Sequence, residues 1–406
     1  MDKKKKKKQK RRPWLRFRHR VVRHVASWVI KPYSYLKYGV RIQKFAEQEK
    51  RPYLVLSNHQ TPFDQFFIGM AFKGPIYYVA TEDIFSLGLP SALLRYLVAP
   101  IPIQKQASDV KAVMTCMRVA REGGTIAICP EGNRTYSGRT EYMNPAIVGM
   151  VRALKVPVAF YRLEGGYGVH PRWSDVVRRG SMKGYVAGVL KPEEYAAMSD
   201  EELLQAIQTA LYVDEACSDG QVFRHKKAAE YLERALYVCP FCGLSTFESH
   251  GDTVKCLKCG RAATYLPTKE LKGEFPYAFV GDWYDAQADF INGLDVTEEE
   301  EPLYVERARL SEVIPYEKKI LMSKAATVEL YGHSICLSYD GKRLTLPFSE
   351  ILAAAVLGRN KLNVYWNDHI YQLKGDKRFN ALKYVNLYYR YKNIKKGDGN
   401  GKFLGL

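Results

Sequence analysis

His59 and Asp64 are two side chains that together could move a proton. An imidazole takes up and releases a proton near neutral pH. An ionised carboxylate beside it can fix its tautomer and stabilise the imidazolium that forms. Four residues separate the two side chains, so a tight turn is needed to bring them together. The pair therefore predicts a general base that is oriented by a carboxylate.

The residues on either side of this pair favour such a turn. Residues 53–57 form a short apolar run that predicts a buried strand, and residues 65–72 predict a helix. Thr61 suits the N-cap, Pro62 the first helical position and Asp64 the third residue of a capping box. The helix dipole would help to keep Asp64 ionised. The simpler interpretation is a polar strand-to-helix turn in which Asp64 serves only as a cap.

A second polar stretch, residues 129–135, follows the apolar strand predicted at residues 125–128. Its Pro, Gly132 and Asn indicate a tight loop whose backbone amides can point at an anion. Arg134 can bind a phosphate with its forked guanidinium, and Glu131 can accept from a hydroxyl or hold Arg134 in place. Taken alone, the stretch could also be a plain turn with a surface Glu–Arg pair.

Two further segments carry weaker signals. Residues 99–105 contain two prolines, which predict a stiff extended segment that ends in the cation Lys105. Lys105 could contact a phosphate or could simply be solvated. Residues 156–160 are apolar and are expected to form a wall or part of the core.

Strand and helix signals alternate from residue 52 to about residue 190, and the clearest helix is predicted at 108–122. This alternation predicts an α/β fold with a mainly parallel sheet flanked by helices. Sites in open α/β sheets form at the carboxyl ends of strands, where His59 and Glu131 both lie. The strands are expected at residues 53–57, 76–81, 125–129, 156–161 and 185–190.

The order of these motifs resembles the glycerolipid acyltransferase family, and within it the bacterial 1-acyl-sn-glycerol-3-phosphate (lysophosphatidic acid) acyltransferases. The resemblance covers roughly residues 50–190. It is carried by His59 with Asp64, by Ile101-Pro102-Ile103 before Lys105, by Pro130-Glu131-Gly132 before Arg134, and by Val156-Pro157-Val158.

The resemblance implies a reaction and a role for each residue. His59, oriented by Asp64, would take the proton from the free hydroxyl of a lysophospholipid as that oxygen attacks an acyl thioester of coenzyme A or acyl carrier protein. Arg134 and Lys105 would hold the acceptor's phosphate, and Glu131 with Gly132 would bind its glycerol part or the arginine. In the family an Arg stands at the position of Lys105, so the bidentate contact of an arginine is lost there. The fourth motif also departs, because Phe160 replaces a Pro.

The net charge of +19 over 406 residues is concentrated at the N-terminus, where residues 1–24 contribute +12. Residues 2–12 are nearly all charged and cannot build a core. Residues 14–30 predict an amphipathic helix with Trp, Phe and Val on one side and Arg and His on the other. That pattern favours an interfacial membrane helix, although a helix docked on the protein's own core and a nucleic-acid arm are alternatives. We expect neither a signal peptide nor a spanning helix, because no run of 18 uncharged apolar residues occurs.

Four cysteines form a zinc-ribbon pattern. Two Cys-x-x-Cys-Gly units lie thirteen residues apart, and thiolate ligands at this spacing favour a closed, structural Zn²⁺ site in a reducing compartment, with a dithiol redox pair as the alternative. The ligands are Cys239, Cys242, Cys256 and Cys259.

The rest of the chain predicts helices and then a small β-rich domain. Two helices are expected at 192–236, of which the second, at 223–236, is basic and then amphipathic, and the acidic run at 297–301 suggests a linker. Short strands with an Asp340-Gly341 hairpin, closed by a helix at 378–391, resemble the pleckstrin-homology-like (PH-like) or GRAM type. The expected domains are 1–40 (basic tail and membrane-interface helix), 41–190 (acyltransferase), 191–236 (helical connector), 237–267 (zinc ribbon), 268–310 (linker with the acidic run) and 311–394 (β-rich domain with a terminal helix).

These observations predict a peripheral enzyme on the cytoplasmic face of a membrane, and we expect that membrane to be the bacterial inner membrane. Its partners would be an anionic membrane surface, a lysophospholipid and the acyl-CoA or acyl carrier protein donor. A zinc-ribbon protein that binds nucleic acid or protein is the alternative, but it leaves the ordered acyltransferase motifs unexplained, so we do not expect nucleic acid as a partner.

Overall fold

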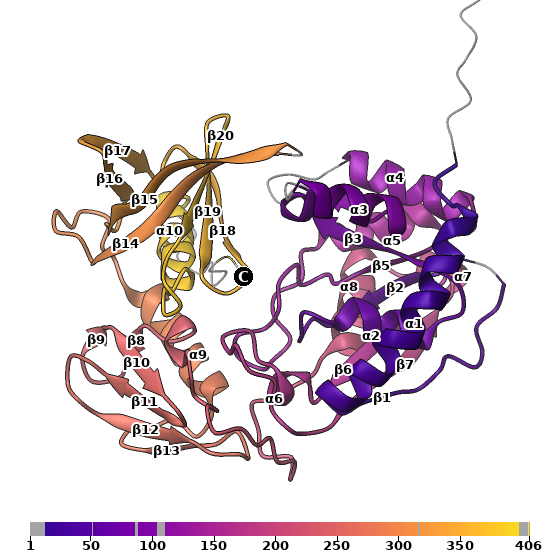
Figure 1. Cartoon of the computed structure of the whole chain (residues 1–406), viewed down its shortest axis with the longest axis horizontal. Helices are drawn as coiled ribbons and strands as arrows, with labels where there is room; N and C mark the ends of the chain where they lie inside the picture. The colour runs from indigo at the N-terminus through magenta and orange to yellow at the C-terminus, as the bar shows by residue number, and fades with distance from the viewer. Residues whose placement is uncertain are drawn as a thin grey trace, which may run out of the picture.

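The computed structural model describes residues 13–50, 52–85, 88–103, 110–315, 317–397 and 405. It contains an α/β part, a cysteine-rich ribbon and an antiparallel β-domain, with the last two on the opposite side of the molecule from the first (Figure 1). The predicted fold class is confirmed: a mainly parallel α/β sheet with helices is followed by a four-cysteine region and a curled antiparallel sheet.

The α/β part is built on a seven-stranded sheet in which all neighbouring strands pair in parallel except β6 and β7, which pair with each other antiparallel. Strands β1 and β4 were not predicted, because three-residue strands carry too little pattern. In sheet order the strands are β1 (Val40–Ile42), β7 (Met182–Leu190), β6 (Val158–Glu164), β2 (Leu54–Ser57), β5 (Thr125–Ile128), β3 (Ile76–Thr81) and β4 (Ile101–Ile103).

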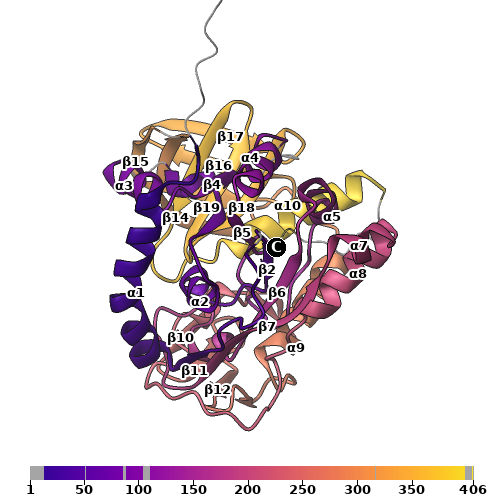
Figure 2. The ribbon, with the colours of Figure 1, turned by 90° about the vertical axis from the view of Figure 1, so that its right-hand side faces the viewer.

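Helices cover both faces of this sheet (Figure 2). Alternate residues of each strand point to opposite faces, so Leu54 and Leu56 pack on α4, α5 and α8, whereas Val55 packs towards α1 and α2. The helices are α1 (Phe17–Tyr38), α2 (Asp64–Ala71), α3 (Leu89–Leu97), α4 (Val110–Arg121), α5 (Ala146–Leu154), α6 (Gly166–Val169), α7 (Pro192–Ala196) and α8 (Asp200–Leu211), with a 3₁₀ turn at Glu82–Phe85.

The ribbon consists of short antiparallel strands followed by one helix. Trp283 of this helix is buried against the first strand and donates a hydrogen bond from Nε1 to the carbonyl oxygen of Val238 at 2.8 Å. The elements are β8 (Val238–Cys239), β9 (Gly243–Leu244), β10 (Phe247–His250), β11 (Thr253–Cys256), β12 (Ala262–Tyr265), β13 (Leu271–Gly273) and α9 (Val280–Gly293).

The β-domain, residues 304–395, is a seven-stranded antiparallel sheet that curls around α10. Asp340 and Gly341 both have positive φ, as the predicted hairpin requires. The sheet order is β17 (Lys342–Pro347), β16 (Ser334–Tyr339), β15 (Lys318–Leu330), β14 (Tyr304–Ile314), β20 (His369–Lys374), β19 (Lys361–Trp366) and β18 (Ile351–Leu357), and α10 is Leu382–Lys395.

Two expectations about the middle of the chain were wrong. Residues 223–236 do not form a helix; they contain only a 3₁₀ turn at Leu232–Arg234, and Tyr231 before it has a φ of 72°. Residues 268–310 are not a linker, since β13, α9 and the first part of β14 lie there. The physical reason is tertiary: the ribbon, α9 and the β-domain share one hydrophobic core, which fixes the chain between them.

Candidate active site and metal centre

The structure brings His59 and Asp64 into direct contact. The Nδ1 of His59 lies 2.7 Å from Oδ2 of Asp64, and the Asp64 side chain is buried whereas His59 is 24% exposed. An ionised carboxylate can only accept, so Nδ1 carries the proton and Nε2 is left as an acceptor. The pair has the geometry that a general base needs.

Backbone and side-chain donors hold Asp64 in place. Its carboxylate accepts from the backbone N–H of Gln60 at 2.8 Å, from the N–H of Thr61 at 3.0 Å and from the hydroxyl of Thr61 at 2.6 Å. The helix begins at Asp64 rather than at Pro62, so Thr61 is not the N-cap that the sequence suggested. Thr61 donates both its N–H and its hydroxyl to the Asp64 carboxylate, and its Oγ1 accepts from the N–H of Phe63, so only one half of a capping box is present. This turn sets the imidazole against the carboxylate.

Glu131 ties the two polar loops together. Its Oε1 accepts from the backbone N–H of His59 at 2.8 Å, and its Oε2 accepts from the N–H of Glu141 at 2.9 Å. Thr135 adds a bond from its N–H to the carbonyl oxygen of His59 at 3.1 Å. Burial raises the pKa of Glu131 well above its usual range, although the two backbone donors act in the opposite direction. Both of its oxygens are thus used to fix the loop around His59.

Arg134 lies in this loop with a buried nitrogen that lacks a partner. Its Nη1 is enclosed and has no hydrogen-bond partner among the described residues. Burial, followed by the neighbouring cations Arg172 and Arg359, lowers the pKa of Arg134 to about 10. Gly132, two residues before Arg134, is exposed and has a φ of 68°, a conformation that residues with a Cβ rarely adopt. A buried guanidinium among cations fits an anionic ligand. The predicted contact Lys105 lies outside the described residues.

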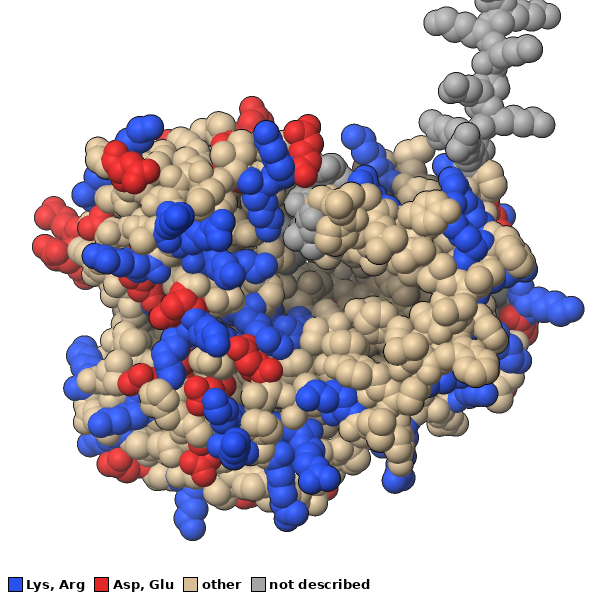
Figure 3. All heavy atoms as spheres, in the orientation of Figure 1, with Lys and Arg blue, Asp and Glu red and all other residues tan. Residues whose placement is uncertain are grey.

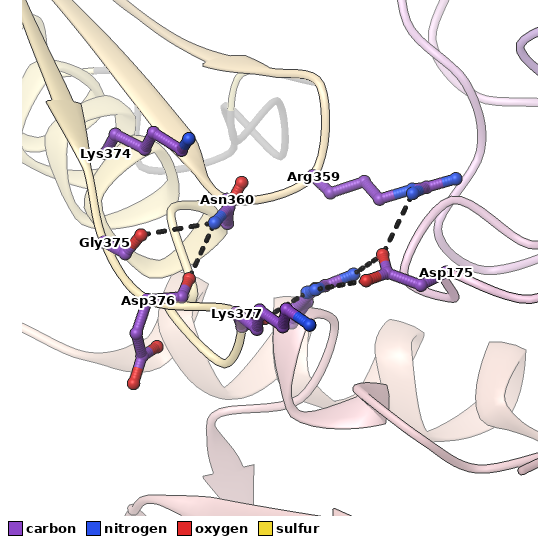
Figure 4. A pocket seen from close by; sticks show the side chains of 8 residues that line it. Asp175, Arg359, Asn360, Lys374, Gly375, Asp376 and Lys377 are labelled. Atoms are coloured by element: carbon purple, nitrogen blue, oxygen red, sulfur yellow. Dashed lines mark hydrogen bonds and ion pairs between the residues drawn. The ribbon is translucent and has the colours of Figure 1, made fainter.

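Three residues that the sequence did not single out surround Arg134. Arg172 donates from Nη1 to the carbonyl oxygen of Arg134 at 2.9 Å. Arg359 of the β-domain donates to Nε2 of His170 at 2.9 Å and lies 3.0 Å from Asp175 (Figure 4). His170 therefore has its proton on Nδ1, 3.3 Å from the hydroxyl of Tyr38, and burial followed by the nearby arginines lowers its pKa to about 3. Of these three residues, only Arg172 stands in a run that is distinctive in the sequence, Pro171-Arg172-Trp173. Arg359 lies more than 200 residues along the chain from the motifs that contain His59 and Arg134, so no local pattern could connect it with them.

Helix α1 rests on the α/β part with its polar side and exposes its apolar side. His19 is buried, with Nδ1 3.0 Å from the hydroxyl of Tyr77, and Arg23 donates to the carbonyl oxygen of Phe72. Phe17, Val21, Val25, Trp28, Val29 and Leu36 are exposed on the other side, and Leu89, Leu93 and Tyr96 of the adjoining α3 extend this apolar surface. No described helix is long and apolar enough to cross a bilayer. The polylysine segment lies outside the described residues.

The four predicted metal ligands come together. Their sulfur atoms all lie within 4.8 Å of one another, with Cys239 3.5 Å from Cys242 and 3.9 Å from Cys259. Tetrahedral Zn–S bonds of about 2.3 Å place two sulfurs about 3.8 Å apart, so the cluster has the right size for Zn²⁺. Gly243 and Gly260, which follow the two Cys-x-x-Cys units, both have positive φ, and the backbone N–H of Arg261 lowers the pKa of Cys259 to about 6.

The chain is similar to known proteins over part of its length. Residues 39–160 match the family model described as Acyltransferase. The human 1-acyl-sn-glycerol-3-phosphate acyltransferase beta is 30% identical over 122 residues, which span 28% of this chain and 42% of the length of that relative. The crystal structure of the 1-acyl-sn-glycerophosphate (LPA) acyltransferase of Thermotoga maritima is 18% identical, with a TM-score of 0.40, over 48% of this chain and 78% of that one.

Proposed function

We propose that this protein is a peripheral membrane acyltransferase that moves a fatty acyl group from a thioester to the free hydroxyl of a lysophospholipid. The first candidate for the acceptor is 1-acyl-sn-glycerol-3-phosphate, which would give phosphatidic acid. The donor is acyl-CoA or acyl acyl-carrier-protein. The acyltransferase match over residues 39–160 and the geometry of the site support this proposal.

In the proposed reaction His59 acts as the general base. Its Nε2 accepts the hydroxyl proton as the oxygen attacks the thioester carbonyl, and Asp64 stabilises the imidazolium that forms. A carbon–oxygen bond forms and the carbon–sulfur bond breaks, and the same proton then passes to the departing thiolate. No covalent acyl-enzyme is needed, because His59 activates the acceptor itself.

The observation that carries the choice of acceptor is the buried, unpartnered Nη1 of Arg134 in a loop hydrogen-bonded to His59. A buried donor without a partner is costly, on the order of 1–3 kcal/mol. A phosphate oxygen at this position would remove that cost and would be favoured by Arg172 and Arg359 nearby. Lys105 is proposed as a second phosphate contact, on the resemblance alone.

Glu131 and Gly132 are proposed to shape the acceptor site through the loop. Because both carboxylate oxygens of Glu131 accept from backbone N–H groups, its part in the reaction is to position His59. Gly132 is exposed, and a Cβ added to it would meet no atom within 4 Å, so its contribution is the positive φ of the turn and an open approach for the acceptor.

The exposed side of α1 supports the membrane part of the proposal. Phe17 and Trp28 are 79% and 74% exposed, while the basic residues His19 and Arg23 face the protein. A helix that docks by its polar side and presents aromatic and aliphatic side chains outwards is suited to lie in the headgroup region of a bilayer. We propose the cytoplasmic face of the bacterial inner membrane as the location.

Zn²⁺ is proposed as a structural ion held by Cys239, Cys242, Cys256 and Cys259. Two of these cysteines, Cys239 and Cys256, are buried in the core that the ribbon shares with the β-domain. A metal there would fix the ribbon to α9 and the β-domain.

The proposal is tested with pure protein, a panel of lysolipids and both classes of donor. We expect His59→Ala to abolish thioester-dependent acyl transfer while the zinc content and the melting temperature stay unchanged. His369→Ala is the matched control, because His369 also pairs with a carboxylate, Glu312, at 2.6 Å but lies on the β-domain. Transfer that survives in His59→Ala, or an absence of transfer to every lysolipid, would refute the assignment.

A further inference from the structure

Arg172 is a buried arginine that joins the loop carrying Arg134 to the β-domain. Its Nη1 donates to the carbonyl oxygen of Arg134 at 2.9 Å, and its Nη2 donates to the carbonyl oxygen of Val356 on β18 at 3.4 Å. Nη2 also lies 3.4 Å from Oδ1 of Asn133, the residue before Arg134. The guanidinium lies over the ring of Tyr136, 4.3 Å from its centroid, and the whole residue is only 3% exposed. One side chain therefore holds the loop at two points and the β-domain at a third.

Arg359 makes a second tie between the same two parts of the molecule. It lies in the turn between β18 and β19, and its guanidinium contacts Asp175 at 3.0 Å and Nε2 of His170 at 2.9 Å. Asp175 also pairs with Arg234 at 2.7 Å, so its carboxylate lies between two arginines from distant parts of the chain (Figure 4). The β-domain thus holds the segment 170–175, which follows α6, at both of its ends.

The same segment reaches the turn between His59 and Asp64. His170 lies 3.3 Å, through Nδ1, from the hydroxyl of Tyr38, the last residue of α1. The centroid of the Tyr38 ring is 5.0 Å from that of Phe63, which directly precedes Asp64. Tyr38 and His170 are both buried. A continuous line of packed side chains therefore runs from the β-domain to this turn.

These contacts fix a loop that has no regular secondary structure, since residues 129–138 form only turns and bends. The guanidinium of Arg172 stays charged even when it is buried, so a shift of the loop or of the β-domain would leave its donors without acceptors, which is costly. Figure 3 shows that the surface is hollowed where the α/β part meets the β-domain. The junction therefore borders open space from which a ligand can approach.

We propose that the β-domain is part of the acceptor site, and that Arg172 and Arg359 are the positioning residues through which it holds Arg134 in place for the acceptor's phosphate. The proposal rests on the proposed function, which makes Arg134 the phosphate contact, and it adds a role for the β-domain. Arg172 and Arg359 act through the loop, because their own Nη groups already donate to acceptors within the protein.

The test compares Arg172→Lys with Arg178→Lys in the full-length, zinc-loaded protein. Lysine keeps the charge of Arg172 but lacks the planar fork that donates in two directions. Arg178 is the matched control, because it is also buried, lies in the same connection between α6 and β7, and also stacks on aromatic rings. Its donors bind Gly168, Ala228 and Tyr265 instead of the loop that carries Arg134.

We expect Arg172→Lys to raise KM for 1-acyl-glycerol-3-phosphate at least about tenfold, as the loss of one charge-assisted contact implies, with KM for the donor and kcat within about threefold of the parent. Arg178→Lys should melt at a lower temperature but keep the parental KM. Arg359→Gln should raise the same KM as Arg172→Lys does, and its 31% exposed side chain keeps the test available where Arg172→Lys fails to fold. A parental KM in both test variants, or an equal rise in Arg178→Lys, would overturn the proposal.

Hydrogen exchange distinguishes a failure of this proposal from a failure of the proposed function. The backbone N–H groups of Gly132, Thr135 and Glu141 are hydrogen-bonded and should be protected in the parent. Arg172→Lys should weaken this protection at least about tenfold, and Arg178→Lys should keep it. A parent that transfers no acyl group to any lysolipid refutes the proposed function, and exchange then decides whether the β-domain holds the loop. Unchanged exchange in Arg172→Lys would overturn the present proposal even in an active enzyme.

Discussion

The replacement Asp64→Asn isolates the charge that is proposed to stabilise the imidazolium of His59. The amide keeps the size of the carboxylate, and its oxygen can still accept from Nδ1 of His59, while the hydroxyl of Thr61 can rotate to accept from its NH₂ group. The substitution therefore removes one negative charge and leaves the shape of the turn largely intact.

The magnitude follows from the contact distance. An Nδ1 to Oδ2 distance of 2.7 Å places the two charge centres about 4 Å apart, and at an effective dielectric constant of about 20 their attraction is about 4 kcal/mol. That energy corresponds to about 10³-fold in rate. Because His59 is 24% exposed and solvent screens part of the attraction, we expect kcat for acyl transfer to fall by about 10²- to 10³-fold.

The assay follows release of the free thiol from acyl-CoA with a thiol-reactive dye at saturating lysolipid. Asp200→Asn, the same change at the exposed start of α8, is the control and should keep full activity. Since Asp64 is proposed to act through the imidazole, the double variant His59→Ala/Asp64→Asn should be no slower than His59→Ala. A single Asp64→Asn variant within tenfold of the parent, or a double variant whose losses simply add, would refute this reasoning.

Four further predictions address other parts of the molecule. Arg134→Lys should raise KM for 1-acyl-glycerol-3-phosphate at least about tenfold through the lost charge-assisted contact; an equal rise in KM for the donor would contradict this. Metal analysis should find one Zn²⁺ per chain, and its removal by a chelator should lower the melting temperature by several degrees, whereas an unchanged melting curve would count against a structural ion. The pKa of His170 is lowered to about 3, so between that pH and about 6.5 the unfolded chain binds more protons than the folded one, and the free energy of unfolding falls on acidification through this window. In urea unfolding, the loss of unfolding free energy between pH 7 and pH 5 should be about 2 kcal/mol smaller in His170→Asn than in the parent. Equal losses in the parent and the variant would contradict the assignment. Trp28→Glu should weaken co-sedimentation with anionic vesicles, while Val305→Glu, at an exposed position of the β-domain, should not; equal weakening would argue against α1 as the membrane contact.

The parts of the site that could be predicted are those set by neighbours in the chain. His59 and Asp64 lie five residues apart, and each Cys-x-x-Cys unit with its glycine is a local turn. Strands β2, β3, β5, β6 and β7 were visible because each contains a short apolar run between turn signals, whereas the three-residue strands β1 and β4 were not. Such features depend on local backbone geometry, which the residue types constrain directly.

Local sequence patterns predicted some features wrongly and gave no indication of others. The pattern at residues 223–236 resembled an amphipathic helix, but Arg234 there is buried and pairs with Asp175 of the α/β part, and Tyr231 turns the chain at a positive φ. Glu131 was predicted to bind the acceptor or Arg134, and the residue pattern carried no sign that its two oxygens also accept from backbone groups of His59 and Glu141. At residues 223–236 contacts between distant segments outweighed local preference.

The sequence by itself indicated the candidate proton-transfer pair, the four cysteines of the candidate metal site and the amphipathic character of the first helix, because spacing along one turn or one helix face fixes them. Only the tertiary structure decided which side of that helix faces the protein, that Arg359 lies near Arg134, and that Lys374 stands opposite both Arg309 and Lys361 in the β-domain sheet. These relations depend on strand register and on packing between segments tens to hundreds of residues apart, and neither periodicity nor motif spacing encodes them.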